Sequence, residues 1–140
     1  MTTADYDRFA AAYAAENETG LFNAHYERPA MLGLLGDVSG RRVLDAGCGS
    51  GPLTEGLRDR GAVVSGFDVS PAMVELARRR LGEEVDLRVA DLGGRLPFAD
   101  AEFDDVVASL VLHYLEDWTQ PLAELRRVVR PGGRLLVSVN

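Results

Sequence analysis

The chain has few or none of several residue types, and each shortage excludes a class of function. It contains one cysteine, Cys48, among 140 residues, so no internal disulfide can form and nothing indicates an oxidising compartment. All 15 basic residues are arginines, which excludes Schiff-base chemistry through a lysine. No apolar run approaches the roughly 18 residues of a membrane-spanning helix, and the N-terminus lacks the pattern of a signal peptide. We expect a cytoplasmic protein with no membrane partner.

Basic residues are also in deficit relative to acidic ones. The 15 arginines stand against 22 acidic residues, giving a formal net charge of −7, whereas proteins that bind nucleic acid generically need a basic surplus to neutralise phosphates. The length fits one domain, and 46% hydrophobic residues is typical of a globular chain. The sequence therefore favours a folded protein with a small-molecule partner and no nucleic-acid partner.

Two stretches of the chain differ in their patterning. Before residue 40 the pattern is helical: Tyr6, Phe9 and Tyr13 share one helical face, and Pro29 begins a further helix. From Arg42 onward, apolar runs alternate with helical patterns, which indicates βαβ units and a parallel sheet. We expect strands at 42–46, 62–67, 85–90, 104–110 and 134–139. We expect helices at 29–35, at 52–60, between a cap at Ser70 and Gly82, and from a cap at Thr119 to the Pro-Gly-Gly run at 131–133.

The expected strands differ in polarity. The third alternates apolar and polar residues from Val85 to Val89, which suits an edge position, whereas the other strands contain apolar runs typical of burial on both faces. The fifth strand is apolar yet ends the chain, and a bare apolar edge is a liability. Either further strands are missing, so that the chain is truncated, or a second copy covers this edge in a homodimer.

The strongest local signal is the run VLDAGCGSGP at residues 43–52. An apolar strand is followed by glycines at 47, 49 and 51 and then by a helix start, which lets the backbone turn tightly and approach a ligand closely. A strand–helix turn without a ligand could use the same glycines. The spacing departs from the dinucleotide fingerprint, because Pro52 stands where its third glycine belongs.

A second signal is Asp68, 21 residues after Gly47 at the end of the second expected strand. A carboxylate at about this spacing can accept hydrogen bonds from ribose hydroxyls. The alternative is a strand-end aspartate that caps a backbone amide. Together with the glycine loop, Asp68 favours a ligand with a ribose and no pyrophosphate.

Five segments resemble class I S-adenosylmethionine-dependent methyltransferases, especially the small-molecule type called type 11. They occur in family order over about residues 41–139: VLDAGCGSG, GFDVS, ADLGGRLPFAD, FDDVVASLVLHYLEDW and LRRVVRPGGRLLVSV. The resemblance implies a Rossmann-like three-layer α/β/α fold with a parallel sheet of about five strands in the order 3-2-1-4-5, without the family's last antiparallel strands. It also implies an S-adenosylmethionine-binding domain at 41–140 under an N-terminal helical lid at 1–40.

The resemblance assigns binding roles to particular residues. Asp45 and the loop of Gly47, Cys48, Gly49 and Gly51 match the site for the cofactor's amino-acid end, with Cys48 as a small filler. Asp68 matches the ribose acid and Val69 a wall of the adenine pocket. Asp91 matches the acceptor of the adenine amino group, although it could be a plain loop aspartate, and Leu92 would offer its backbone N–H. Ser109 and Leu110 match the position facing the methionine amine, and Tyr13 would contribute from the lid.

The implied function is methyl transfer from S-adenosyl-L-methionine to a small-molecule acceptor, with S-adenosyl-L-homocysteine as product. A sulfonium methyl is already activated, so orientation can replace a fixed catalytic set. His113 is the weak candidate for a base, against a packing role, and no metal site is predicted. The alternatives are a non-catalytic or truncated cofactor-binding domain and an NAD-binding oxidoreductase. The run Ser109-Leu110-Val111-Leu112 lacks a DNA adenine methyltransferase motif, and the arginines at 78–80 are expected on a solvated helix face.

Overall fold

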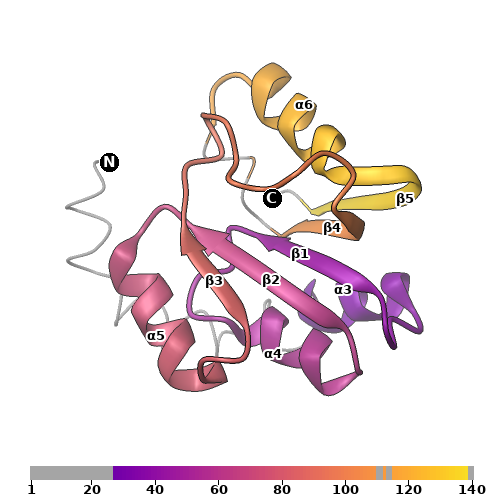
Figure 1. The fold of residues 1–140 in the computed structure, drawn as a ribbon, viewed down its shortest axis with the longest axis vertical. Coiled ribbons are helices and arrows are strands. Elements are labelled where there is room, and N and C mark those ends of the chain that lie inside the picture. Colours follow the sequence, from indigo (N-terminus) through magenta and orange to yellow (C-terminus); the bar gives the residue numbers. More distant parts are fainter. Residues whose placement is uncertain (1–26, 110–111, 113–114, 139–140) are drawn as a thin grey trace.

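The protein is described here by a computed structural model covering residues 27–109, 112 and 115–138. Its five strands are β1 (Arg42–Ala46), β2 (Val63–Asp68), β3 (Asp86–Val89), β4 (Phe103–Ser109) and β5 (Val129–Ser138). They form one all-parallel sheet in the order β3-β2-β1-β4-β5, which confirms the order that the family resemblance implied. The helices are α3 (Arg28–Leu35), α4 (Pro52–Asp59), α5 (Pro71–Leu81) and α6 (Thr119–Val128). Figure 1 shows the arrowheads of β1, β2 and β3 pointing the same way.

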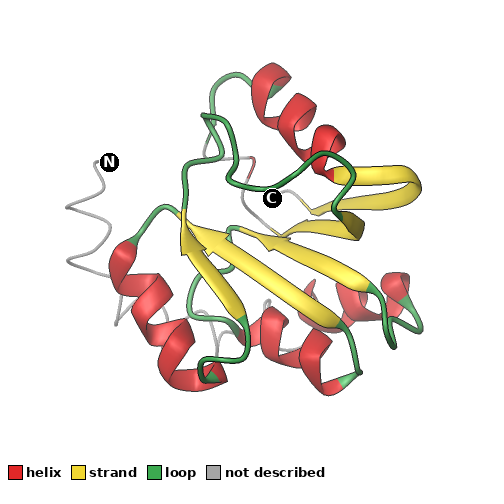
Figure 2. Ribbon diagram, in the orientation of Figure 1, coloured by secondary structure: helices red, strands yellow, loops and turns green. Residues whose placement is uncertain are grey.

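Helices cover both faces of the sheet, which confirms the three-layer architecture (Figure 2). Successive side chains of a strand point to opposite faces, and β1 shows the consequence. Val43 packs in a core cluster with residues of α3, α4 and α5, whereas the next residue, Leu44, packs in a second cluster with Leu125 and Val128 at α6. The apolar runs of the central strands therefore fill two cores at once.

The ends of α5 follow the capping that the sequence predicted, whereas the start of α6 does not. Ser70 caps α5 as predicted, since its Oγ accepts a hydrogen bond from Met73 N at 3.2 Å, and Gly82 ends the helix at a positive φ of 80°. The predicted Thr119 cap of α6 is wrong, because Thr119 is already the first helical residue. The Asp117 carboxylate accepts from Thr119 N at 2.9 Å instead, and a charged acceptor binds such an amide more strongly than a hydroxyl.

The two edges of the sheet differ from each other. The short strand β3 lies at one edge, as its alternating pattern predicted. The other edge strand, β5, begins at Val129 rather than at the predicted Arg134, because Pro131 disfavours helix at Arg130 and α6 ends early. The expected burial of β5 on both faces is wrong for the described chain, in which Val137 is 38% exposed. Pairing of this edge with a second copy stays a prediction.

Residues 27–40 pack with the sheet. Met31 and Leu35 of α3 and the following Val38 are all buried in the same core cluster as α4 and α5. The predicted lid boundary at residue 40 is not tested, and Tyr13 lies outside the described residues. None of the helices in the described ranges is long and apolar enough to cross a membrane.

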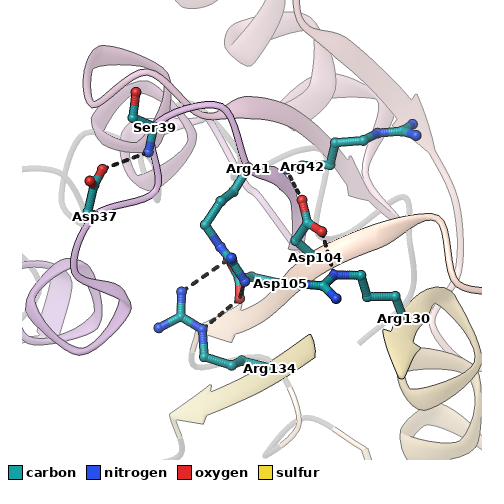
Figure 3. Close-up of polar contacts among 8 residues, drawn as sticks. All are labelled: Asp37, Ser39, Arg41, Arg42, Asp104, Asp105, Arg130 and Arg134. Carbon is teal, nitrogen blue, oxygen red and sulfur yellow. Dashed lines mark hydrogen bonds and ion pairs between the residues drawn. The ribbon is translucent and has the colours of Figure 1, made fainter. Parts of the chain in front are cut away.

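Charged side chains join three strands at the end of the sheet opposite the glycine loop (Figure 3). Asp105 of β4 is fully buried and accepts hydrogen bonds from Arg41 Nε and Arg134 Nε, each at 2.7 Å. Its neighbour Asp104 is more exposed and binds Arg130 Nε at 2.5 Å. Although burial acts to raise it, the two arginines hold the pKa of Asp105 below its usual value. These contacts pin the start of β4 between β1 and β5.

We expect Asp105→Asn to lower the free energy of unfolding by about 1–3 kcal/mol, because it weakens charge-assisted bonds to both arginines. Asp104→Asn on the same strand removes the same charge from a partly exposed position, so its cost should stay below about 1 kcal/mol. Denaturant unfolding of both variants at neutral pH measures the difference. An equal loss of unfolding free energy in the two variants would show that the ion pairs of Asp105 stabilise the fold no more than a surface ion pair does.

Candidate functional site

The glycine loop lies where the parallel strands end. We call this end of the sheet, with the residues that close or follow the strands, the carboxyl edge; it comprises residues 46–51, 68–70, 90–92 and 109. Gly47, Gly49 and Gly51 have φ values of 72°, 57° and 91°, a region that other residues rarely adopt. A Cβ on Gly51 would stand 3.0 Å from Leu81 Cδ1, so this glycine also permits close packing of the loop on α5. A Cβ on Gly49 would meet nothing within 4 Å. The backbone at Gly49 is therefore open to a ligand.

Cys48 fastens the loop to β2. Its backbone N donates to Phe67 O at 2.8 Å, and its side chain packs against Gly66, where an added Cβ would lie 3.2 Å from Cys48 Cβ. Burial raises the pKa of the Cys48 thiol well above its ordinary value, and the charges of Asp45 and Asp68 act in the same direction. A buried thiol of this kind is not a nucleophile, so the structure supports the small-filler interpretation.

Two of the three arginines on α5 donate hydrogen bonds to backbone carbonyls outside their own helix, which the sequence did not indicate. Arg80 Nε donates to Ser50 O in the glycine loop at 3.1 Å, and Arg78 Nη2 donates to Leu87 O of β3 at 2.9 Å. Only Arg79 is an exposed residue paired along its own helix, with Glu75. Arg78 and Arg79 are exposed, as the prediction of a solvated face has it, whereas Arg80 is only partly exposed. The contacts of Arg78 and Arg80 show in addition that a long guanidinium can reach carbonyls beyond its own helix.

Asp68 joins the loop to the end of β2. The carboxylate is buried, with 7% of the residue exposed; Oδ1 accepts from Gly49 N at 3.2 Å and Oδ2 accepts from Ser70 N at 3.0 Å. The capping role weighed as an alternative is thus present. An ionised carboxylate has about four lone-pair positions, so backbone contacts and ribose contacts are compatible. The two amides fix how Asp68 is oriented.

Asp45 is the most deeply buried acid of the edge. It is 1% exposed, and its Oδ2 accepts a hydrogen bond from Thr54 Oγ1 on α4 at 2.7 Å. Burial raises its pKa to about 7; the Thr54 hydrogen bond opposes the rise, and the charges of Glu27 and Asp68 add to it. A buried carboxyl group in this setting favours a cationic neighbour. The sequence pointed to Asp45 but not to Thr54.

The next strand ends supply more peripheral residues. Asp91 is exposed and its Oδ1 accepts from Gly93 N at 2.8 Å, so it forms a local turn. Leu92 is 6% exposed and packs into the core cluster near α6, whereas Val69 is 42% exposed beside Asp68. The adenine-binding roles of Asp91, Val69 and Leu92 stay predictions.

The connection that carries Asp91 is anchored by α6. Glu124 Oε1 accepts from Leu96 N at 2.7 Å, and Arg127 donates to Leu96 O at 3.1 Å and to Phe98 O at 2.8 Å. No sequence pattern indicated this arrangement, because the partners are 28 to 31 residues apart. It holds the connection between β3 and β4 against the sheet.

The ends of β4 and β5 meet at a buried acid that the sequence did not single out. Glu27 is 8% exposed, and its Oε1 accepts hydrogen bonds from Ser109 Oγ and Ser138 Oγ, the second at 2.7 Å. Ser109 is thus at the carboxyl edge as predicted. Three further candidates, Tyr13, Leu110 and His113, lie outside the described residues, and no group of metal-ligating side chains occurs within the described ranges.

Comparison with known proteins decides the family. Residues 44–137 match the family described as "Methyltransferase domain". The chain belongs to this family. Among relatives of this methyltransferase domain, the demethylmenaquinone methyltransferase of Tropheryma whipplei (strain Twist) is 36% identical over 134 residues, covering 94% of this chain and 56% of the relative. The malonyl-[acyl-carrier protein] O-methyltransferase of Serratia marcescens is 39% identical over 108 residues, covering 77% and 42%.

A solved structure agrees with this assignment. The S-adenosylmethionine-dependent methyltransferase of Mesorhizobium loti superposes with a TM-score of 0.75 at 32% identity, covering 84% of this methyltransferase domain and 55% of that chain. The chain spans about half the length of the curated relatives it matches. The family excludes the oxidoreductase alternative that the glycine loop alone had left open.

Proposed function

We propose that the carboxyl edge binds S-adenosyl-L-methionine and that the protein transfers its methyl group to a small-molecule acceptor. The observation that carries the proposal is the hydrogen bond from Gly49 N to Asp68 Oδ1 at 3.2 Å. It brings the loop proposed for the cofactor's amino-acid end into contact with the acid proposed for its ribose. Family membership over residues 44–137 supports the same assignment.

The residues at this edge suit the chemical groups of the cofactor. Within the described chain, Asp45 Oδ1 receives no hydrogen bond, and a buried acceptor of this kind requires a donor. An ammonium supplies both the donor and the positive charge. Asp68 is an acceptor fixed for hydroxyls, and the exposed Val69 offers an apolar surface to a base. Together these groups match an amino acid, a ribose and a ring in series.

The bound cofactor supplies an activated methyl group, and the protein's task is orientation. Asp45 and the loop hold the amino-acid end, and Asp68 holds the ribose in line with it. Holding the reacting atoms at a near-attack distance and excluding water can contribute roughly 7–11 kcal/mol to the barrier reduction. No fixed base is required for an acceptor that is already acidic.

Calorimetric titration tests the binding half of the proposal. We expect S-adenosylhomocysteine to bind with one site per chain and NAD to show no heat of binding, because Pro52 follows the loop where a dinucleotide site has glycine. The absence of binding by S-adenosylhomocysteine at millimolar concentration would refute the proposal. Equal binding of NAD would show that the site does not select against a dinucleotide and would contradict the proposed interpretation of the glycine loop.

Turnover assays test the catalytic half. The names of the relatives suggest two acceptor chemistries, a ring of the quinone type and a carboxyl carried on acyl-carrier protein. We expect radiolabelled methyl transfer to an acceptor of the small-molecule class. Binding of the cofactor without transfer to either kind of acceptor would support the alternative, a cofactor-binding domain that is not catalytic in this form.

A further inference from the structure

Glu27 is a buried carboxylate that the sheet alone does not explain. It occupies the N-cap position of α3, yet its side chain makes no capping hydrogen bond. The side chain instead turns to the ends of β4 and β5, where Oε1 accepts from Ser109 and Ser138, residues 82 and 111 positions away in sequence. The chain therefore places a third buried acid at the carboxyl edge, beside Asp45 and Asp68.

The second oxygen of Glu27 is not used inside the described chain. Both serine hydroxyls bind Oε1, and within the described ranges Oε2 receives no hydrogen bond. Asp45 has the same property, since Thr54 binds Oδ2 and leaves Oδ1 without a donor from the described residues. Buried acceptors are almost always satisfied by some partner. Two such oxygens at one edge indicate a donor that is not part of the described protein.

The two carboxylates lie close enough to influence each other. The charge of Glu27 is among the causes that raise the pKa of Asp45, and no arginine is among the groups that act on this carboxyl. Two buried like charges repel unless a cation lies between them. An ammonium group has three donors and one positive charge, so it satisfies both the hydrogen-bonding and the electrostatic requirement.

We propose that Glu27 is the second carboxylate of the subsite for the ligand's α-ammonium group, facing that group together with Asp45. The proposal rests on the proposed function, because the ammonium belongs to the amino-acid end of the cofactor. Ser109 and Ser138 hold Oε1, which orients Oε2. Glu27 thereby links the start of α3 to the occupied state of the site.

Two ligands that differ only in the amino-acid end test this role. S-adenosylhomocysteine carries the ammonium, and 5′-methylthioadenosine has the same nucleoside and thioether without it. We expect Glu27→Gln to lower the affinity for S-adenosylhomocysteine by at least about tenfold, because the amide does not carry the charge that attracts the ammonium. The affinity for 5′-methylthioadenosine should change by less than about twofold. The amide oxygen of the substituted side chain can still accept hydrogen bonds from the two serines, so the contacts with the ends of β4 and β5 persist.

Two further variants complete the experiment. Glu75→Gln removes the same charge from an exposed position on α5 and should leave both affinities unchanged. Glu27→Asp keeps the charge but shortens the side chain by one methylene. It should therefore also lower the affinity for S-adenosylhomocysteine more than the affinity for 5′-methylthioadenosine. This variant serves as the test if thermal unfolding shows that Glu27→Gln does not fold.

The outcomes separate the competing explanations. Equal weakening of both ligands would show that Glu27 only supports the fold, and unchanged affinity for both would show that it does not face the ligand; either result overturns the proposal. Failure of the wild-type chain to bind both ligands would instead refute the proposed function itself.

Discussion

Asp68→Ala is expected to weaken binding of S-adenosylhomocysteine by at least about tenfold while the chain stays folded. The substitution removes the acceptor proposed for the ribose hydroxyls. It also removes the acceptor of Gly49 N and Ser70 N, so the loop loses the contact that aligns it with β2. Isothermal titration measures the affinity, and circular dichroism verifies the fold.

Two variants accompany this experiment. Asp68→Asn keeps one oxygen that can accept from one of the two backbone amides, so its affinity loss reports the charge together with the loss of one amide contact. Asp59→Ala removes an exposed carboxylate at the end of α4 and should leave affinity unchanged. Unchanged affinity in Asp68→Ala would count against the ribose assignment, because no other described acid replaces its contact with Gly49.

Ligand affinity is expected to fall by about tenfold or more as the pH is lowered from about 7.5 to about 5.5. Burial raises the pKa of Asp45 to about 7, so the carboxyl group takes up a proton across this range. An ammonium binds the ionised form, and protonation therefore competes with the ligand. Thr54, Glu27 and Asp68 are the groups that act on this carboxyl, and the two acids make its ionisation less favourable. Titrations with S-adenosylhomocysteine at several pH values measure the effect.

Asp45→Asn isolates the origin of that pH dependence. The amide cannot ionise and can still accept from Thr54, so the variant should bind weakly at every pH and lose most of the slope. A slope that persists in Asp45→Asn would assign the titration to another group and contradict the expectation.

The raised pKa of Asp45 also affects the stability of the ligand-free protein, which depends on pH in the opposite direction to ligand affinity. The folded pKa of Asp45 lies above its ordinary value, so between about pH 4 and about pH 7 the native state binds more protons than the unfolded state. The contribution of Asp45 to stability therefore falls as pH rises through this window. Thermal unfolding of wild type and Asp45→Asn without ligand should differ in slope over this range.

Local patterns were sufficient where the physical cause is local. Ser70, Pro71 and Gly82 marked the ends of α5 because a cap, a fixed φ and a positive φ act within one turn. The alternation in β3 marked an edge strand because side chains of a strand face opposite sides. The start of β5 was missed because the effect of Pro131 on the preceding residue was not applied to α6, which ends at Val128. The pairing of Val129 with Phe103 then begins the strand at that residue.

Contacts between segments far apart in the sequence could not be predicted from local patterns. Arg80 reaches Ser50 across 30 residues and Arg127 reaches Leu96 across 31, and no periodicity links such pairs. Thr54 was missed for a different reason, since it is nine residues from Asp45 but meets it only because α4 packs back over β1. Hydrophobic patterns show which face of an element is buried without identifying the opposing side chain.

By itself, the sequence determined the alternation of strands and helices and therefore a parallel sheet, because these depend on hydrophobic periodicity and on glycine and proline positions. Its resemblance to a known family implied the order of the strands. Only the tertiary structure decided which carboxylate oxygens have no donor among the described residues and which accept from serines or backbone amides. That distinction depends on the packing of segments as far apart as Glu27 and Ser138, and a chain shows which atoms are satisfied only when it is folded.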